Sequence, residues 1–372
     1  MKVLQIYKDY YPPVKGGIEK HINLLANGLS QQGVDVEVLV SNVSRKLDIE
    51  YNNNIRIIKA PQLGRIASAP INLTFSRLLI HAAEKADLLH FHLPNPTAVI
   101  AYLFSGIQKP VVVTYHSDIV RQKVLKKLYT PFSKWFLAKA DAIIATSVPY
   151  AHTSDELLHY HHKCHIIPLG IQLAGKKTNN PPAISSEDLH KRFGPQLIIF
   201  VGKFRYYKGV NYLVEAMKEV DATLLLIGSG PLEYRLKGYV ESLALQEKII
   251  FLGEVSDKDI SSYFKACDVG VLPSIYKSEA FGMVLLEAMA YGKAVVSTEL
   301  GTGTSFVNVN NETGLVVPPR NVKALSAAIN RLLNDRDLRI EYGEAGKQRV
   351  KQCFDIQKMI DQVMSVYSAT LK

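Results

Sequence analysis

The chain contains the stretch Ser278-Glu-Ala-Phe-Gly-Met-Val-Leu-Leu-Glu-Ala-Met-Ala290, which combines a helix start with two acidic side chains. Ala, Met, Leu and Glu favour helix, so a helix is expected from Met283 onward. The unpaired N–H groups at a helix N-terminus suit a phosphate. Glu279 lies just before this N-terminus, and Glu287 lies inside the helix. Carboxylates accept paired hydrogen bonds from adjacent hydroxyls, so we expect the two glutamates to contact two different parts of one phosphate-bearing ligand. The alternative is that Glu279 caps the helix and Glu287 is solvated.

Length and composition indicate a globular protein with two domains. The 372 residues are 47% hydrophobic and 21% charged, enough for two cores and too apolar for wholesale disorder. No apolar run approaches the roughly 20 residues that span a bilayer, and Met1–Lys8 is too short for a signal peptide and predicts a strand. Cys164, Cys267 and Cys353 have no paired spacing, which suits thiols in a reducing cytoplasm.

The formal net charge of +10 predicts an anionic partner. Residues 119–140 contain no acidic side chain, and basic and apolar side chains alternate through the basic segment 121–139. Pro131 is expected to divide this segment into two helices. Two interpretations stay open: an amphipathic surface for an anionic membrane, or a core-facing helix pair with a solvated basic edge. Nucleic acid is not expected, because no recognisable binding motif accompanies the charge.

Short apolar strands alternate with helical stretches in two successive rounds, typical of doubly wound parallel sheets covered on both faces. The expected strands are Val3–Tyr7, Val36–Val40, Ile55–Ile58, Leu88–His92, Val111–Tyr115, Ala142–Ala145 and His165–Pro168, then Leu197–Val201, Thr223–Ile227, Ile249–Leu252, Val269–Leu272, Ala294–Ser297 and Gly314–Val316. We therefore expect two Rossmann-like domains, residues 1–172 and 192–355, facing across a cleft. The polar, proline-rich stretch Leu173–Lys191 is expected to link them.

Cationic and glycine-rich loops follow two strands of the second round. Phe200-Val-Gly-Lys-Phe-Arg-Tyr-Tyr-Lys-Gly209 places Lys203, Arg205 and Lys208 on one strand-to-helix loop, where they are expected to neutralise a diphosphate. In Gly228-Ser-Gly-Pro231, Gly228 is expected to let the backbone approach the same ligand. For the loop that carries Lys203, Arg205 and Lys208, the alternative is a solvated basic turn that binds no ligand.

In the first round, Gly16 and Gly17 stand at a helix start and offer amides to a phosphate; the alternative is a plain turn with Glu19 as a first-turn acid. His116 follows a strand, at the edge where a cleft residue is expected, and His90 and His92 end the preceding strand. The histidine-rich run 159–165 matches no usual zinc spacing, and we expect no metal site.

These stretches together resemble the family-4 glycosyltransferases, retaining enzymes of the GT-B fold. The resemblance rests on Gly16-Gly17, Thr114-Tyr-His116, Ile167-Pro-Leu-Gly-Ile171, the loop 201–209, Gly228-Ser-Gly230 and the E-x7-E pair in 278–290. Glu299–Asn308 with Thr313–Pro319 is similar to bacterial polysaccharide mannosyltransferases. The family usually has Arg at position 203, where this chain has Lys. The compact charge of an ammonium group therefore replaces a guanidinium group, which can form two parallel hydrogen bonds to a phosphate. The family often has Asp where Gln172 stands.

The resemblance implies roles for individual residues. Glu287 is expected to hold the ribose and Glu279 the donor sugar. The backbone of Phe281, Gly282 and Met283 is expected to contact sugar and phosphate. Lys203 and Lys208 are expected to bind the diphosphate, and His116 is expected to meet the donor sugar. Of these, Glu279, His116 and Lys208 are the expected catalytic residues. The last helix, 356–371, is expected to pack on the first domain.

The implied function is a retaining, metal-independent hexosyltransferase without a bound cofactor. It would move mannose from GDP-mannose, or a hexose from a UDP-sugar, to a saccharide acceptor. We expect a lipid-linked oligosaccharide of a cell-surface polysaccharide such as lipopolysaccharide. The expected location is the cytoplasm, peripheral to the inner face of the plasma membrane. Two alternatives remain: a nucleotide-sugar epimerase or hydrolase of the same fold, and a non-catalytic nucleotide-sugar-binding protein.

Overall fold

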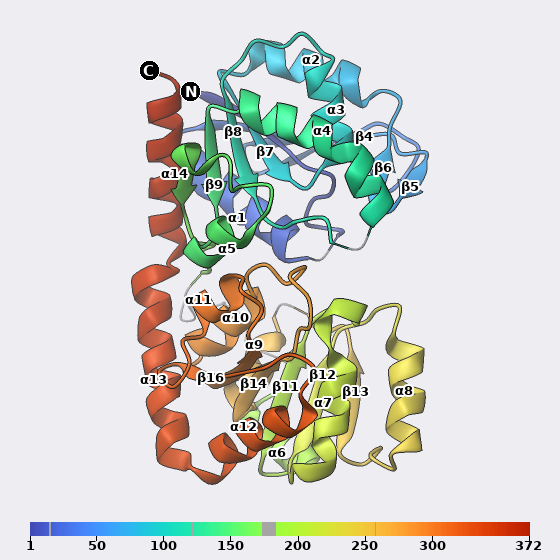
Figure 1. The fold of residues 1–372 in the computed structure, drawn as a ribbon, viewed down its shortest axis with the longest axis vertical. Helices are drawn as coiled ribbons and strands as arrows, with labels where there is room; N and C mark the ends of the chain where they lie inside the picture. Colours follow the sequence, from blue (N-terminus) through green and yellow to red (C-terminus); the bar gives the residue numbers. More distant parts are fainter. Residues whose placement is uncertain (15, 121, 173–183, 257) are drawn as a thin grey trace. The chain divides into compact units, whose positions relative to one another are not determined.

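The chain forms two compact units in a computed structural model, which describes residues 1–14, 16–120, 122–172, 184–256 and 258–372 (Figure 1). Unit 1 comprises Met1–Gly170 and Ile356–Lys372, and unit 2 comprises Ile171–Asp355. Each is built on a largely or wholly parallel sheet with helices on both faces. The alternating strand and helix pattern predicted this α/β class, and the structure confirms it. Arg121, the side chain of Lys123 and most of the predicted linker, residues 173–183, lie outside the described residues.

Unit 1 contains an eight-stranded sheet in the order β10-β9-β8-β7-β1-β2-β4-β3. Its strands are β1 (Lys2–Ile6), β2 (Asp35–Ser41), β3 (Asp48–Asn52), β4 (Ile55–Ala60), β7 (Leu88–Leu93), β8 (Val111–Tyr115), β9 (Ala142–Ala145) and β10 (Cys164–Ile166). All pair in parallel except β3, which runs antiparallel to β4. A separate hairpin pairs β5 (Gly64–Ile66) with β6 (Ala69–Ile71). The strand pattern did not predict β3, because this edge strand is polar and exposed and lacks an apolar run.

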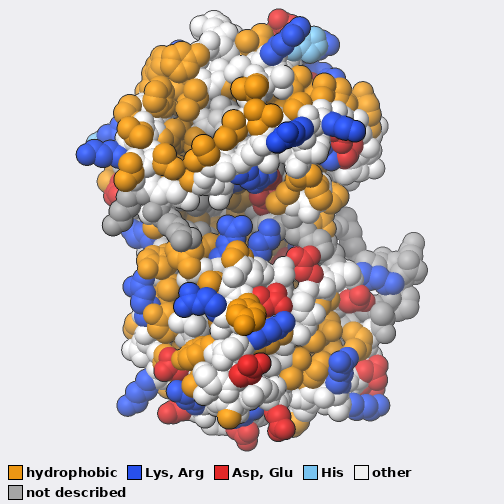
Figure 2. Space-filling model, turned by 90° about the vertical axis from the view of Figure 1, so that its right-hand side faces the viewer, with side chains coloured by type: hydrophobic (Ala, Val, Ile, Leu, Met, Phe, Trp, Pro, Cys, Tyr) orange, Lys and Arg blue, Asp and Glu red, His pale blue; other side chains and the backbone are white. Residues whose placement is uncertain are grey.

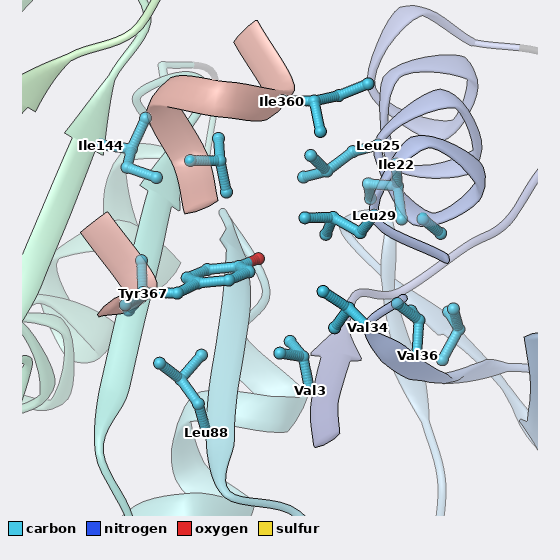
Figure 3. Close-up of a cluster of buried hydrophobic side chains, with 14 of the residues drawn as sticks. Val3, Ile22, Leu25, Leu29, Val34, Val36, Leu88, Ile144, Ile360 and Tyr367 are labelled. Carbon is cyan, nitrogen blue, oxygen red and sulfur yellow. The ribbon is translucent and has the colours of Figure 1, made fainter. Parts of the chain in front are cut away.

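The core of unit 1 contains side chains from both the first and the last elements of the chain. Its helices are α1 (Gly17–Gln31), α2 (Phe75–Lys85), α3 (Pro96–Leu103), α4 (Lys123–Lys139), α5 (Val148–Thr153) and α14 (Ile356–Thr370). Figure 3 shows Ile360 and Tyr367 of α14 among buried side chains of α1 and the sheet. The helices approach closely at Gly28, where an added Cβ would lie 2.0 Å from Cδ1 of Ile360. A glycine on α1 thus allows α14 to complete this core.

The prediction that Pro131 divides the basic segment is wrong, because α4 continues through it from Lys123 to Lys139. Proline inside a helix removes one backbone donor and crowds the carbonyl four residues earlier, which weakens the helix locally. The Thr130 hydroxyl donates to the Lys126 carbonyl at 2.8 Å. Phe136 and Leu137, on the same helix, are fully buried in the interior of unit 1. Tertiary packing of this face therefore keeps the helix continuous. No helix in the described part of the chain is long and apolar enough to cross a bilayer.

Unit 2 contains a six-stranded, wholly parallel sheet in the order β13-β12-β11-β14-β15-β16. Its strands are β11 (Leu197–Val201), β12 (Thr223–Ile227), β13 (Ile249–Gly253), β14 (Val269–Leu272), β15 (Ala294–Thr298) and β16 (Gly314–Val317). Its helices are α6 (Ser186–Phe193), α7 (Val210–Ala216), α8 (Glu233–Ser242), α9 (Ile260–Ala266), α10 (Met283–Ala290), α11 (Gly303–Val307), α12 (Val322–Asn334) and α13 (Arg336–Cys353). The predicted linker is too long, because α6 begins inside it with a capping box between Ser185 and Asp188.

Both sheets have a point at which the strand order reverses. In unit 2, β11 lies between β12 and β14, and in unit 1, β1 lies between β2 and β7. Loops that follow the two strands at such a point diverge to opposite sides and leave a crevice at the carboxyl edge, where ligands of open α/β sheets bind. In unit 2 these loops are residues 202–209 after β11 and 273–282 after β14. They carry Lys208 and Glu279.

Candidate active site

The loop between β14 and α10 holds Glu279 in a fixed position. The Ser274 hydroxyl donates to Oε2 of Glu279 at 3.0 Å, and the Thr302 hydroxyl donates to its backbone carbonyl at 2.8 Å. The Gly303 amide donates to the neighbouring Ala280 carbonyl at 2.7 Å. An added Cβ at Gly303 would lie 2.7 Å from that carbonyl oxygen, so glycine allows this contact. These bonds order the carboxylate side chain and its backbone before any ligand binds.

Lys208 and Glu279 form a nearly buried ion pair. Nζ of Lys208 lies 2.6 Å from Oε2 of Glu279, and the two side chains are 13% and 10% exposed. Burial alone lowers the pKa of Lys208, but the charge of Glu279 and its hydrogen bond to Lys208, with further contributions from Tyr207 and, more weakly, Glu287, outweigh it, so this pKa lies above its ordinary value. Lys208 is thus cationic at neutral pH and lies within the field of both glutamates. The sequence suggested the two acids and the cation, but not their direct bond.

Two glycine-containing turns lie beside Lys208 at the end of β11. A Cβ added at Gly202, where φ is 153°, would lie 3.8 Å from Nζ of Lys208. Gly228, the residue after β12, has φ of 127°, and its added Cβ would lie 2.2 Å from the Gly202 carbonyl oxygen. The structure therefore brings the two glycine-containing turns into contact beside Lys208. A side chain at Gly228 would separate the two turns, whereas Gly202 is favoured by its positive φ rather than by lack of space.

The other two cations of this loop lie apart from the buried pair. Lys203 is half-buried and Arg205 is exposed. Neither side chain forms an ion pair with a carboxylate of the described residues. Phe204 between them is fully buried, and its amide donates to the Ser229 carbonyl at 2.9 Å. This buried anchor fixes the loop while two positive charges stay available to an anionic ligand.

The N-terminus of α10 lies directly beside Glu279. Gly282 is the N-cap residue in a left-handed conformation, with φ of 87°, and Met283 begins the helix as predicted. Phe281 is 4% exposed and packs edge-on against Phe354 at 5.9 Å. Glu287 is half-buried inside the helix. The first N–H groups of α10 and the two carboxylates thus come from one short segment.

At the start of α1, the structure reveals a carboxylate beside the predicted phosphate-binding glycines. Gly16 is the N-cap residue and Gly17 the exposed first residue of α1. A Cβ added at Gly16 would lie 2.1 Å from Oε2 of Glu19, which is 8% exposed. A first-turn acid stabilises the positive end of the helix. It also repels an anion there, so phosphate binding by these amides stays a prediction.

His116 lies in a buried cluster of histidines in unit 1. Its Nε2 lies 3.0 Å from Nδ1 of His92, and the two rings stack with centroids 5.3 Å apart. His21 of α1 packs edge-on against both rings. Burial lowers the pKa of His21 to about 4 and that of His90 to about 3, and it holds the pKa values of His92 and His116 well below the usual range. All four imidazoles are therefore neutral at physiological pH.

This cluster is also the place where the described residues come closest to a metal site. The ligand nitrogens of His21, His92 and His116 lie within 4.8 Å of one another. Neutral imidazole nitrogens are good ligands for Zn²⁺. In this structure, however, His92 and His116 share a hydrogen bond that a metal ion would have to break. None of these three histidines belongs to the histidine-rich run 159–165.

A cavity with a volume of about 350 Å³ in unit 1 was not predicted. It is lined by Tyr10, Pro12, Pro13, Val14, Val40, Ser41, Asn42, Val43, Asp48, Glu50 and Lys59. Lys59 and Glu50 form an ion pair on its wall. The acidic residues come from β3, the edge strand that the pattern missed, so no sequence signal pointed to this cavity.

Comparison with known proteins identifies the family. Residues 15–174 match the description "Glycosyltransferase Family 4", and residues 184–349 match "Glycosyl transferases group 1". The O-antigen chain mannosyltransferase C of Escherichia coli is 34% identical over 374 residues, which cover 100% of this chain and 99% of that protein. The chain belongs to this glycosyltransferase family. The D-rhamnosyltransferase WbpZ of Pseudomonas aeruginosa is 36% identical over 355 residues, with 95% and 92% of the two chains covered.

Solved structures show the same fold. A sucrose-phosphate synthase from Thermosynechococcus elongatus superposes on the glycosyltransferase with a TM-score of 0.84 and 24% identity, over 99% of this chain and 98% of that one. The Anabaena protein HepE in complex with UDP-glucose gives 0.79 and 18%, over 99% and 100%. The predicted GT-B fold and the predicted family are therefore confirmed.

Proposed function

We propose that the glycosyltransferase transfers a hexose, with mannose favoured, from a nucleoside diphosphate sugar to a saccharide acceptor of a cell-surface polysaccharide. The observation that carries this proposal is the buried Lys208–Glu279 pair beside the N-terminus of α10, with Glu287 in the same field. An O-antigen mannosyltransferase among the relatives supports mannose and a polysaccharide acceptor. GDP-mannose is therefore the favoured donor, ahead of a UDP-sugar. The reaction is proposed to retain the anomeric configuration.

The site's charges suit the departure of a nucleoside diphosphate. Breaking the anomeric bond places negative charge on the leaving diphosphate and positive charge on the sugar ring. Lys208, Lys203 and the first N–H groups of α10 are proposed to stabilise the diphosphate without a metal ion. Glu279, which Lys208 and Ser274 hold in place, is proposed to bind the sugar hydroxyls rather than to attack the ring. Glu287 is proposed to hold the ribose.

Donor binding is tested by thermal unfolding with GDP-mannose, GDP, UDP-glucose and UDP. A ligand at 100 times its Kd stabilises the folded state by about 2.7 kcal/mol, which raises the Tm measurably. We expect the largest Tm shift with GDP-mannose and almost none in the Lys208→Ala variant. Lys237→Ala is the matched control, because Lys237 forms an exposed pair with Glu233 at 2.8 Å on α8. Equal shifts in both variants would contradict this assignment of the donor site.

Turnover separates transfer from the two alternative functions. Nucleotide release that requires a saccharide acceptor supports transfer, and the anomeric configuration of the product, measured by NMR, tests retention. Release without any acceptor would instead indicate an epimerase or hydrolase. Donor binding without release on any acceptor would indicate a non-catalytic binding protein.

Unit 1 also has an exposed apolar and basic surface that suits an anionic membrane. We call it the α4 surface: Ile100, Phe104, Val124, Leu125, Leu128 and Trp135, with Lys127, Lys134 and Lys139. Val124 is 75%, Leu128 66% and Phe104 69% exposed, and Phe104 packs edge-on against Trp135 at 6.0 Å. Figure 2 shows hydrophobic side chains over the drawn face of unit 1, with lysine and arginine among them. We propose that the α4 surface attaches the enzyme to a membrane that carries a lipid-linked acceptor.

Vesicle sedimentation tests this attachment. We expect the full-length protein to sediment with vesicles of phosphatidylglycerol and phosphatidylcholine, and less so in high salt. Replacing Leu128 and Trp135 by Ser removes two side chains, each worth about 1.5–3 kcal/mol when buried, so binding is expected to fall at least about tenfold. Tyr234→Ser in unit 2, which removes an aromatic side chain that is 89% exposed, is the control. Equal binding of all three proteins would contradict the proposal.

A further inference from the structure

The buried histidines of unit 1 are linked to the C-terminal helix by hydrogen bonds and by a contact between two rings. The hydroxyl of Tyr367 lies 2.6 Å from Nδ1 of His90, whose Nε2 lies 2.7 Å from the Thr114 hydroxyl. The His90 ring lies against the His92 ring with centroids 4.3 Å apart. Both histidines are on β7 and point to the same face of the sheet, because they are two residues apart. His90 is thus held on both sides, and it supports one face of His92.

His92 in turn fixes His116 by a bond to one particular nitrogen. Nδ1 of His92 faces Nε2 of His116 at 3.0 Å, while Nε2 of His92 and Nδ1 of His116 are buried without a partner among the described residues. Because both rings are neutral, one of the two facing nitrogens donates and the other accepts. Whichever tautomer is present, one of the two remaining nitrogens donates and the other accepts.

The free Nδ1 of His116 can pair with a hydroxyl group in either tautomer, because a hydroxyl both donates and accepts. A buried unpaired nitrogen costs about 1–3 kcal/mol, so a structure that keeps two of them here, besides those of His21, gains from a polar ligand. The sugar hydroxyls of the proposed function supply that chemistry. His116 cannot offer Nε2 to a sugar while that nitrogen bonds to His92, so Nδ1 is the atom left for a substrate.

We infer that His92 is a positioning residue, which aims Nδ1 of His116 at a substrate hydroxyl, and that Tyr367 and His90 support it from the C-terminal helix. This inference rests on the proposed function, because it assumes a sugar ligand at His116. It assigns His92 and Tyr367 a part in catalysis although neither needs to touch the substrate. The contact of His116 with the sugar would use Nδ1.

Two amide substitutions at His92 test the inference, because they differ in which imidazole nitrogen they replace. The amide of Asn falls near the position of Nδ1, and that of Gln falls near Nε2. We expect His92→Asn to keep the bond to His116 and to retain kcat within a few-fold. We expect His92→Gln to lose that bond and to lower kcat about tenfold, with little change in the donor KM, since one orienting hydrogen bond is of that size. Tyr367→Phe is expected to give a smaller loss of kcat of the same kind.

The controls separate this role from packing, from a metal site and from a failure of the proposed function. His165→Gln, at an exposed position of β10 in the same sheet, is expected to behave like the wild type. Equal kcat in His92→Asn and His92→Gln would overturn the inference. If both fell together, a lower Tm would show packing, and one equivalent of Co²⁺ bound by the wild type alone would show a metal site. Absence of sugar transfer by the wild-type enzyme would instead reject the proposed function.

Discussion

Lys208→Ala is expected to lower turnover by about 100-fold or more while the protein stays folded. The substitution removes the cation that is proposed to stabilise the leaving diphosphate, and one preorganised charge contact is worth about 10²–10³ in kcat. It also removes the ammonium group that lies 2.6 Å from Oε2 of the nearly buried Glu279. The negative charge of Glu279, no longer offset by Lys208, would then repel the diphosphate. Steady-state kinetics with donor and acceptor, with Tm measured on the same samples, test the expectation.

Glu279→Ala is expected to reduce turnover by a similar factor, because Lys208 loses the group that holds it in place. The two residues act as one unit, so the double variant Lys208→Ala, Glu279→Ala is expected to lose much less than the product of the single losses. Lys237→Ala breaks a similarly close pair, at 2.8 Å, on the exposed face of α8 and is expected to leave kcat unchanged. Near-normal turnover in Lys208→Ala or in Glu279→Ala would remove both residues from the proposed mechanism.

The sequence predicted the buried strands accurately because their signal is local. β8, β9, β11, β12 and β14 begin and end at the predicted residues, since each is a short apolar run bounded by polar residues or turns. β3 was missed for the opposite reason, because an exposed edge strand needs no apolar pattern. Pro131 was misjudged because proline disfavours helix locally, whereas the burial of Phe136 and Leu137 stabilises it through tertiary contacts.

The candidate site was predicted as a set of residue types but not as a set of bonds. The spacing of Glu279 and Glu287 and the cations after β11 are visible in the sequence. The reversal of strand order between β11 and β14, which brings Lys208 to Glu279, is a property of the whole sheet. The histidine cluster shows the same limit, since His21, His92 and His116 come from three separate segments. Their pairing depends on strand register, which no local pattern encodes.

Ending the chain at Asp355 is expected to unfold unit 1 while unit 2 stays folded. The deletion removes α14, whose five fully or nearly buried core side chains are Met359, Ile360, Val363, Val366 and Tyr367. At about 1.5–3 kcal/mol each, they contribute roughly 7–15 kcal/mol, comparable with the whole stability of a domain, about 5–15 kcal/mol. Figure 3 shows why the loss is not local, since Tyr367 and Ile360 lie among the side chains of α1 and of the sheet.

Hydrogen exchange measured by mass spectrometry distinguishes the two units in this truncated protein. Peptides from β1, β7 and α1 are expected to lose protection, because their shared core with α14 is gone, whereas peptides from β11 and β14 are expected to keep it. A chain ending at Thr370 lacks only the exposed Leu371 and Lys372 and serves as the control. Protection of β1 and β7 in the chain ending at Asp355 would mean that unit 1 folds without α14. In that case Tyr367 could not be essential to the order of the histidine cluster, and the support of His92 would have to come from β7 and β8 alone.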